Sequence, residues 1–133
     1  MFNTIRLIGT ITRSIQVQSN KKFSPLGLGN NAFLYIIRAI ENPGMFLGEL
    51  ADALSIDRST AFRGIKKLAK NGYLDLKSDD HDGRLQRVFP TQLAKDIYPE
   101  LFEFEKTQSK YLLAKLSEDE QAELLRLLKK TQH

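Results

Sequence analysis

Cysteine is absent from the 133-residue sequence. Its absence excludes disulfide bonds, thiolate metal sites and the sensing of oxidants through thiols. Long hydrophobic runs are lacking too, because Arg6, Arg13 and other polar residues interrupt the apolar positions near the N-terminus. These positions are too broken for a signal peptide or a membrane span. We therefore expect a cytoplasmic protein with no membrane partner.

The residue patterns typical of enzymes are missing as well. The sequence has no glycine-rich phosphate loop and no serine, histidine and aspartate set with convergent spacing. The densest group of metal-binding residue types, residues 79–82 (Asp-Asp-His-Asp), falls in one expected turn, where four consecutive residues cannot all face one ion. The only other histidine is His133. We predict no catalytic residue, no cofactor and no functional metal ion.

Hydrophobic residues make up 41% of the chain, enough for one core, so we expect a single domain over residues 1–133. The net charge of +4 favours a polyanionic partner only mildly. Residues 1–44 carry five basic residues against one acidic, residues 45–90 eight against seven, and residues 91–133 seven against eight. A basic surface in the central region therefore requires that the two signs lie on different faces.

The first part of the chain is expected to form two helices. Apolar residues at three- and four-residue spacing predict an amphipathic helix from Phe2 to about Gln18. Residues 20–30, rich in asparagine, glycine and lysine, are expected to form a loop. A second helix is predicted from about Asn31 to Glu41, and Asn42, Pro43 and Gly44 end it.

A helix-turn-helix is predicted next. A short helix runs from Leu47 to Leu54, and a turn follows at Ser55, where glycine is common, and Ile56. The following helix spans Asp57 to Lys70, and the Asp57 carboxylate is placed to accept hydrogen bonds from the free amides. Two faces of this helix differ: Ala61, Ile65 and Leu68 form an inward stripe, and Ser59, Arg63, Lys66 and Lys70 project from the opposite side.

A hairpin follows the glycine that ends this helix, Gly72. Alternating residues predict a strand from Tyr73 to Lys77, and residues 79–83 form a polar turn that ends in an Asp-Gly pair. The return strand is expected from Leu85 to Phe89. Its register stays open at this point, because Leu85 and Phe89 indicate one inward face and Val88 indicates the other.

Two helices are predicted to complete the chain. One runs from a cap at Thr91 to about Leu113, with a bend at Pro99. The other opens with a capping box formed by Ser117 and Glu120 and continues to about Lys130. The helices at both ends of the chain carry more apolar surface than one small domain can cover, so we expect them to pair two copies. This assigns residues 1–20 and 92–133 to dimerisation and residues 30–90 to a winged helix-turn-helix.

Several short segments occur in a characteristic order: Glu49-Leu50-Ala51, Ile56-Asp57-Arg58-Ser59-Thr60, LAKNGYL at 68–74, Asp82-Gly83-Arg84, Pro90-Thr91 and LSEDE at 116–120. In this order they resemble the MarR family of transcriptional regulators over nearly the whole chain. The resemblance implies a mainly α-helical fold with a small β-hairpin wing. It also implies a homodimer that binds a pseudo-palindromic operator, usually repressing transcription until a small molecule or another signal releases it. The sequence departs from the family at Gly64, where a larger apolar residue is more frequent, at Pro90, where leucine is usual, and at Lys66, often acidic.

Double-stranded DNA is the predicted partner. Base edges in the major groove are read by arginine, lysine and short hydroxyl side chains, a role that fits Ser59, Thr60 and Arg63. Arg84 is expected to enter the minor groove, held by Asp82 through a charge-assisted hydrogen bond as the resemblance suggests. Lys67, Lys70, Lys77 and Arg87 are expected at phosphates. The full predicted DNA-binding set is Arg58, Ser59, Thr60, Phe62, Arg63, Lys66, Lys67, Lys70, Lys77, Asp82, Arg84 and Arg87.

Other interpretations fit the same residues. A row of lysine and arginine is also typical of a solvated helix face, and an Asp-Gly turn exposes its neighbours without any binding role. The alternative function is a winged-helix module for protein interactions that no longer reads DNA. Such a module would carry acidic or apolar residues on the outer helix face, where this chain keeps Arg63, Lys66 and Lys70.

An effector is predicted by chemical class only. Phe23, Phe33, Tyr35, Arg38 and Phe46 would suit a small aromatic or carboxylated ligand if they lay around one cleft. They fit equally well as ordinary core and linker residues. We therefore assign no residue to a ligand.

Overall fold

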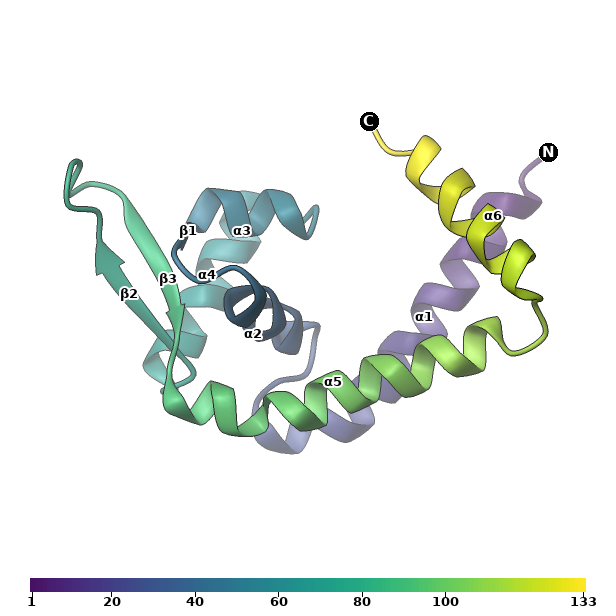
Figure 1. Cartoon of the computed structure of the whole chain (residues 1–133). Helices are drawn as coiled ribbons and strands as arrows, with labels where there is room; N and C mark the ends of the chain where they lie inside the picture. Colours follow the sequence, from purple (N-terminus) through teal and green to yellow (C-terminus); the bar gives the residue numbers. More distant parts are fainter. The chain divides into compact units, whose positions relative to one another are not determined.

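The computed structural model describes residues 1–133, and these form two compact units, Met1–Phe102 and Glu103–His133. Figure 1 shows a mainly helical chain with a small sheet, as the sequence predicts. None of its helices has the length and hydrophobicity needed to cross a lipid bilayer.

Helix α1 (Asn3–Phe23) is longer than predicted, and the 3-10 helix η1 (Ser24–Leu26) follows it directly. The expected loop at residues 20–30 therefore begins later. The physical reason is burial: the helical period continues past Gln18 and places Ser19 and Phe23 in the core. The Asn20 side chain accepts a hydrogen bond from the Asn30 amide at 2.8 Å, which closes the shortened loop.

The helix-turn-helix lies where it was predicted. Helix α2 (Ala32–Glu41) precedes α3 (Leu47–Ala53) and α4 (Arg58–Lys70), and all three bury apolar residues in one core. Ser55, between α3 and α4, has a φ of 54°, the left-handed conformation that glycine adopts most easily. Gly72 has a φ of 88° just beyond α4, as expected of a residue that ends a helix.

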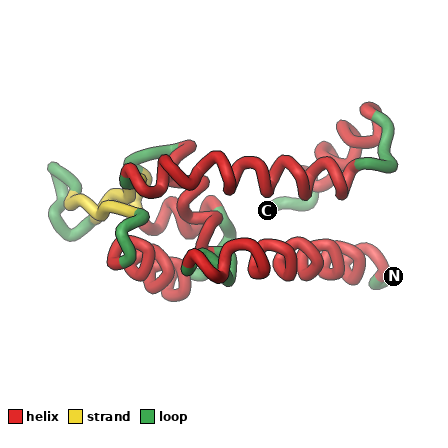
Figure 2. Tube along the Cα trace, turned by 90° about the horizontal axis from the view of Figure 1, so that it is seen from below, coloured by secondary structure: helices red, strands yellow, loops and turns green.

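A three-stranded antiparallel sheet carries the wing (Figures 1 and 2). Strands β2 (Leu74–Ser78) and β3 (Gln86–Pro90) form the hairpin, which extends from the helices and ends in a loop. The third strand, β1 (Met45–Phe46), was not predicted, and it pairs with β3 so that the order is β1-β3-β2. This pairing settles the register, because Met45 lies opposite Val88 and Val88 is fully buried. Of the two faces left open by the sequence, the one with Val88 points inward, and the Leu85 side chain is exposed.

Thr91 joins the base of the wing to helix α5 (Gln92–Leu113). Its hydroxyl oxygen lies 2.6 Å from the Gly72 carbonyl oxygen and 3.0 Å from that of Tyr73, and it accepts a hydrogen bond from the Ala94 amide. Thr91 is therefore the cap that the sequence predicts for this helix, and it also contacts Gly72 and Tyr73, which connect α4 to β2.

The second unit contains the last part of α5 and helix α6 (Glu118–Lys130). The predicted capping box is present: the Ser117 hydroxyl accepts from the Glu120 amide at 3.2 Å, and the Glu120 carboxylate accepts from the Ser117 amide at 3.0 Å. No residue of α6 is buried, and its leucines remain at the surface.

Candidate nucleic-acid interface

Helix α4 is fixed by its cap and by its apolar stripe. The Asp57 carboxylate accepts a hydrogen bond from the Thr60 amide at 3.0 Å, and this hydrogen bonding to Thr60 lowers the pKa of the carboxyl group. Ala61, Ile65 and Leu68 are at most 2% exposed. Because this face is buried, the opposite face of the helix must project outward.

The outward face of α4 carries most of the predicted reading residues. They share solvent exposure and positions along one side of the helix: Ser59, Thr60, Arg63, Lys66, Lys67 and Lys70. The Arg63 guanidinium lies 3.5 Å from the Thr60 hydroxyl, a long contact that leaves its donors available to a ligand. Basic and hydroxyl groups therefore lie together on a rigid helix.

Arg58 lies on the flank of α4 that faces α3. Its guanidinium contacts Asp52 at 3.0 Å, and both side chains are more than half exposed. A Cβ atom on Gly48 would come within 3.2 Å of the Arg58 guanidinium carbon, so the glycine leaves room for this side chain. Arg58 is thus placed beside the row of basic residues and not within it.

The predicted contact between Asp82 and Arg84 is confirmed. The Arg84 Nε and Nη2 atoms each lie 3.1 Å from a different oxygen of Asp82, and the Arg84 amide donates to the same carboxylate at 3.1 Å. These bonds lower the pKa of Asp82 and raise that of Arg84, because each stabilises a charged form. The Arg84 side chain is 90% exposed despite this contact. The wing therefore presents one cation in a defined orientation.

The other two predicted wing residues are placed differently. Lys77 extends over the Phe89 ring, with its Nζ atom 5.0 Å from the ring centroid. Arg87 points into the wing, where its guanidinium contacts Asp79 at 2.9 Å and the Gly44 carbonyl at 2.8 Å. The sequence offers no sign of this difference, because the partners of Arg87 lie 8 and 43 residues away.

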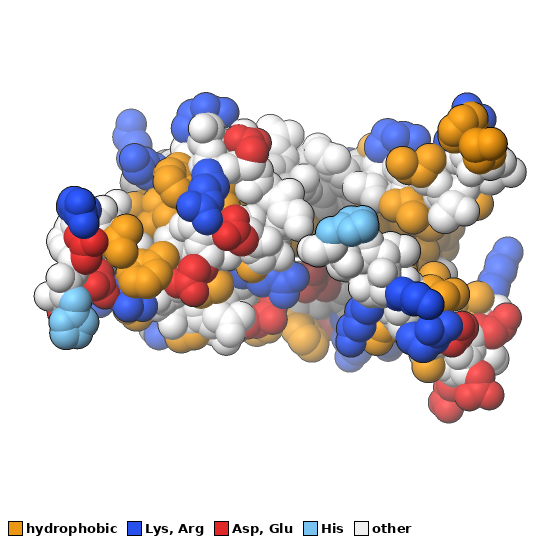
Figure 3. Space-filling view, turned by 90° about the horizontal axis from the view of Figure 1, so that it is seen from above, with side chains coloured by type: hydrophobic (Ala, Val, Ile, Leu, Met, Phe, Trp, Pro, Cys, Tyr) orange, Lys and Arg blue, Asp and Glu red, His pale blue; other side chains and the backbone are white.

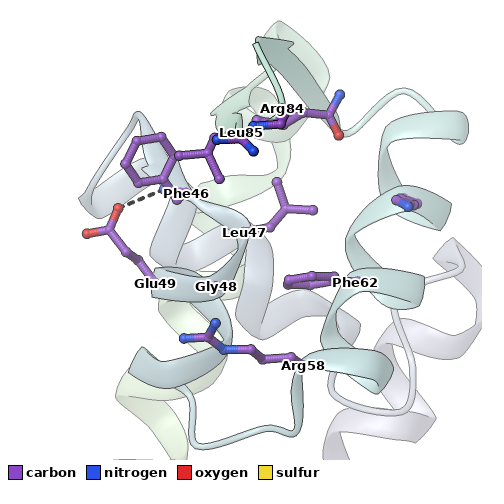
Figure 4. A pocket seen from close by; sticks show the side chains of 10 residues that line it. Phe46, Leu47, Gly48, Glu49, Arg58, Phe62, Arg84 and Leu85 are labelled. Carbon is purple, nitrogen blue, oxygen red and sulfur yellow. Dashed lines mark hydrogen bonds between the residues drawn. The ribbon is translucent and has the colours of Figure 1, made fainter. Parts of the chain in front are cut away.

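A hollow of about 560 Å³ separates the wing from α3 and α4. Figure 4 shows Leu47 and Phe62 facing one another inside it, with Arg84 at one end and Arg58 at the other. The remaining lining residues are Phe46, Gly48, Glu49, Lys66, Leu85 and Gln86. Sequence analysis missed this hollow because its walls come from three segments that only folding brings together.

The five residues considered for an effector do not surround one cleft. Phe23 and Phe33 are buried, and their ring centroids lie 4.9 Å apart. Tyr35 is buried beside Gly64, and Phe46 lines the hollow described above. Arg38 pairs with Glu41 at 3.7 Å. Phe23, Phe33 and Tyr35 therefore belong to the core.

Gly64 has a specific packing role in α4. A Cβ atom at this position would lie 3.1 Å from the Cε2 atom of the Tyr35 ring, tighter than ordinary contact. Burial raises the pKa of Tyr35, and the negative charge of Asp57 adds to this effect. The departure from the expected apolar residue at Gly64 is thus matched by a large ring that occupies the same space.

Acidic and basic side chains are interspersed on the surface around the wing (Figure 3). This agrees with the nearly balanced charge of the central region. The basic character of the candidate interface therefore comes from the outward face of α4, where all the charged side chains are basic, and not from the central region as a whole.

Comparisons with known proteins agree with this arrangement. A model described as MarR family matches residues 26–85. YybA of Bacillus subtilis (strain 168), an uncharacterised HTH-type transcriptional regulator, is 37% identical over 99 residues. The matched region covers 74% of this chain and 66% of that protein, so the chain spans just under two thirds of this curated relative.

Solved structures show the same fold. A putative MarR family transcriptional regulator from Listeria monocytogenes, solved with a 26mer DNA, is 35% identical with a TM-score of 0.91, covering 95% of this chain and 84% of that one. A mutant MarR from E. coli, solved with operator DNA, is 25% identical with a TM-score of 0.83, covering 100% of this chain and 99% of that one.

Proposed function

Because the chain belongs to the MarR family of transcriptional regulators, we propose that it binds an operator in double-stranded DNA as a homodimer and represses transcription. The observation that carries this function is the one-sided arrangement of α4, with a buried apolar stripe and an exposed row of basic and hydroxyl side chains. A repressor of this kind acts on the chromosome, in the cytoplasm.

In the proposed complex, α4 enters the major groove. Arg63 and Ser59 contact base edges, because arginine and short hydroxyl side chains match their donor and acceptor patterns. Lys67 and Lys70, further along the helix, contact phosphates. The contacts to base edges then determine the sequence preference, whereas the contacts to phosphates determine the affinity and its dependence on salt.

The wing supplies a second contact. Arg84 enters the minor groove, where a narrow A·T-rich stretch concentrates negative potential. The carboxylate of Asp82 orients the guanidinium before binding, so that less side-chain freedom is lost when the complex forms. Arg84→Ala should weaken operator binding at moderate salt. Unchanged affinity would exclude a role for Arg84 in the minor groove.

Exposed apolar side chains support the homodimer. On α1 and at its N-cap they include Phe2, Ile5, Ile8 and Ile11, all more than a third exposed. In the second unit, a hollow of about 550 Å³ is lined by Leu112, Leu113, Leu124, Leu125 and Leu128. Burying such surfaces against a second copy removes them from water and supplies the two-fold symmetry that a palindromic operator requires.

Release by an effector completes the proposed function. The hollow beside the wing combines the apolar side chains of Phe62 and Leu85 with the cations of Arg58 and Arg84. A small aromatic carboxylate fits this chemistry. A ligand there would contact residues proposed to bind DNA, so it should lower operator affinity. Titration of the DNA complex with benzoate-type ligands tests this; equal DNA affinity at all ligand concentrations would exclude that class.

Selection of bound sequences from random duplex DNA tests the function as a whole. We expect enrichment of a palindrome with half-sites about 10 base pairs apart, one turn of the duplex. The affinity for the selected site should fall steeply with salt, since each neutralised phosphate releases counterions. If no sequence is enriched, the alternative of a winged-helix protein-interaction module replaces DNA reading.

A further inference from the structure

Arg87 lies at the centre of a group of contacts within the wing. Its Nε atom donates to Asp79 Oδ1 at 2.9 Å, and its Nη1 atom donates to the Gly44 carbonyl at 2.8 Å. The guanidinium carbon also lies 4.1 Å from the centroid of the Phe46 ring. The Asp79 side chain is only 9% exposed. Arg87 therefore directs its charge toward the protein, and its side chain is 39% exposed against 90% for Arg84.

Asp79 continues these contacts into the wing turn. Its second carboxylate oxygen accepts hydrogen bonds from the amides of His81 at 3.1 Å and Asp82 at 3.0 Å. The Asp82 carboxylate in turn holds Arg84. An unbroken series of hydrogen bonds thus leads from Gly44, beside the short strand β1, through Arg87, Asp79 and Asp82 to the tip cation.

The strand ladder alone does not fix this turn. Pairing between β2 and β3 ends at Ser78 and Gln86, and β1 pairs with β3 through only two residues. Beyond this pair the backbone adds two hydrogen bonds, from the Asp79 amide to the Leu85 carbonyl at 2.9 Å and from the Leu85 amide to the Asp82 carbonyl at 3.0 Å. The other contacts that hold the turn come from the side chains of Asp79, Asp82 and Arg87. An arginine suits this role better than a lysine, because its planar fork donates in two directions at once.

We propose that Arg87 and Asp79 form a positioning pair that fixes the wing turn and thereby the orientation of Arg84, and that neither contacts DNA. This rests on the proposed function of the wing. It replaces the expectation from the sequence that Arg87 contacts a phosphate. It also explains why an acidic residue is present at Asp79 in a region proposed to approach phosphates.

The Asp79→Asn variant distinguishes a charge effect from a positioning effect, because the two predict opposite changes in operator affinity. Removing a negative charge near DNA should strengthen binding if charge alone matters. If Asp79 positions Arg84, binding should weaken by about tenfold, within the range for losing one specific contact. Asp80→Asn is the matched control, because it makes the same change one residue away at an exposed carboxylate. We expect its affinity to equal or exceed that of the wild type.

Arg87→Lys supplies a second variant that keeps the positive charge. A phosphate contact would survive this change, whereas the paired contacts to Asp79 and Gly44 would not. We expect a loss of operator affinity similar to that of Asp79→Asn, with an unchanged salt slope. Wild-type affinity in Arg87→Lys, or tighter binding by Asp79→Asn, would overturn the positioning pair.

A double-mutant cycle with Arg84→Ala separates positioning from general destabilisation. If Asp79 acts through Arg84, Asp79→Asn should cost no further affinity once Arg84 is alanine. Additive losses would overturn the inference. All variants are full-length, titrated against the selected operator, with unfolding curves recorded alongside. Wild-type protein that binds no duplex would instead overturn the proposed function and the inference with it.

Discussion

The winged region and the terminal helices use their apolar residues in opposite ways. Helix α2 buries five of its ten residues, whereas α6 buries none of its thirteen. Helix α1 buries only Ser19 and Phe23, both near its C-terminal end. A single chain therefore completes the core that supports α4, but it leaves the apolar stripes of its terminal helices exposed.

This difference separates two tasks. The surface proposed to read DNA needs a rigid support, and a complete core supplies it because close packing resists displacement. The terminal helices need a complementary surface, and exposed leucine and isoleucine side chains supply a favourable free energy when they are buried against one. Substitutions in the two regions should therefore have different consequences.

Charged substitutions in the apolar stripes should have the largest effect. Ile8→Asp or Leu125→Asp should convert the proposed homodimer to monomers, because each places a charge where the proposed interface requires burial. Operator affinity should then fall by about 10²- to 10⁴-fold, as the two half-sites are no longer bound together. Sedimentation measures the mass, and Thr10→Asp on α1 is the control. A dimeric Ile8→Asp protein would contradict the assignment of this stripe.

Gly64→Leu should destabilise the winged region. Its side chain must enter the space of the buried Tyr35 ring, and overpacking of this kind costs about 1–3 kcal/mol of unfolding free energy. Denaturant unfolding measures this loss, and the dimeric state should persist. Gly83→Leu is the control, since no atom lies within 4 Å of an added Cβ atom there. Equal stability of the two variants would mean that the Tyr35 ring moves aside without loss of unfolding free energy.

Arg63→Ala should change neither assembly nor stability. It should remove about 1–3 kcal/mol of discrimination at one operator position, whereas Lys67→Ala should weaken all sequences alike and lower the salt slope by about one. Competition binding with single-base operator variants measures both effects. An unchanged preference in Arg63→Ala would exclude this residue as a base reader.

The smallest expected effect is a loss of stability at acidic pH, and it arises from Asp79 in the winged region. The Arg87 hydrogen bond to Asp79 lowers the pKa of that carboxyl in the folded protein. A depressed folded pKa contributes stability that is present above the unfolded value, about 3.9, and is lost as the pH falls through the folded pKa. Unfolding curves between pH 6 and 2 should therefore show a shallower loss for Asp79→Asn than for the wild type. If stability falls equally with pH in the two proteins, the Asp79 carboxylate makes no such contribution.

Much of the fold was predictable from local patterns. The spacing of Ala61, Ile65 and Leu68 fixes the buried face of α4, and the Ser117 and Glu120 pair marks the start of α6. The contact of Asp82 with Arg84 was also predicted, from the family resemblance of the Asp82-Gly83-Arg84 segment.

Features that depend on distant segments were not predictable. Strand β1 has two residues and exists only through its pairing with β3, so no periodicity reveals it. The extension of α1 to Phe23 depends on a core that forms around that ring. The inward direction of Arg87 depends on Gly44, which no local pattern connects with the wing.

The hydrogen bonds of Thr91 couple the start of α5 to the segment between α4 and β2. Its hydroxyl is hydrogen-bonded to the carbonyls of Gly72 and Tyr73 while it caps the first turn of α5. A displacement of that turn that preserves these bonds carries the end of α4 and the base of the wing with it. The two elements proposed to contact DNA would then move together, so a small rotation of the first turn of α5 would change the positions of Arg63 and Arg84 at the same time.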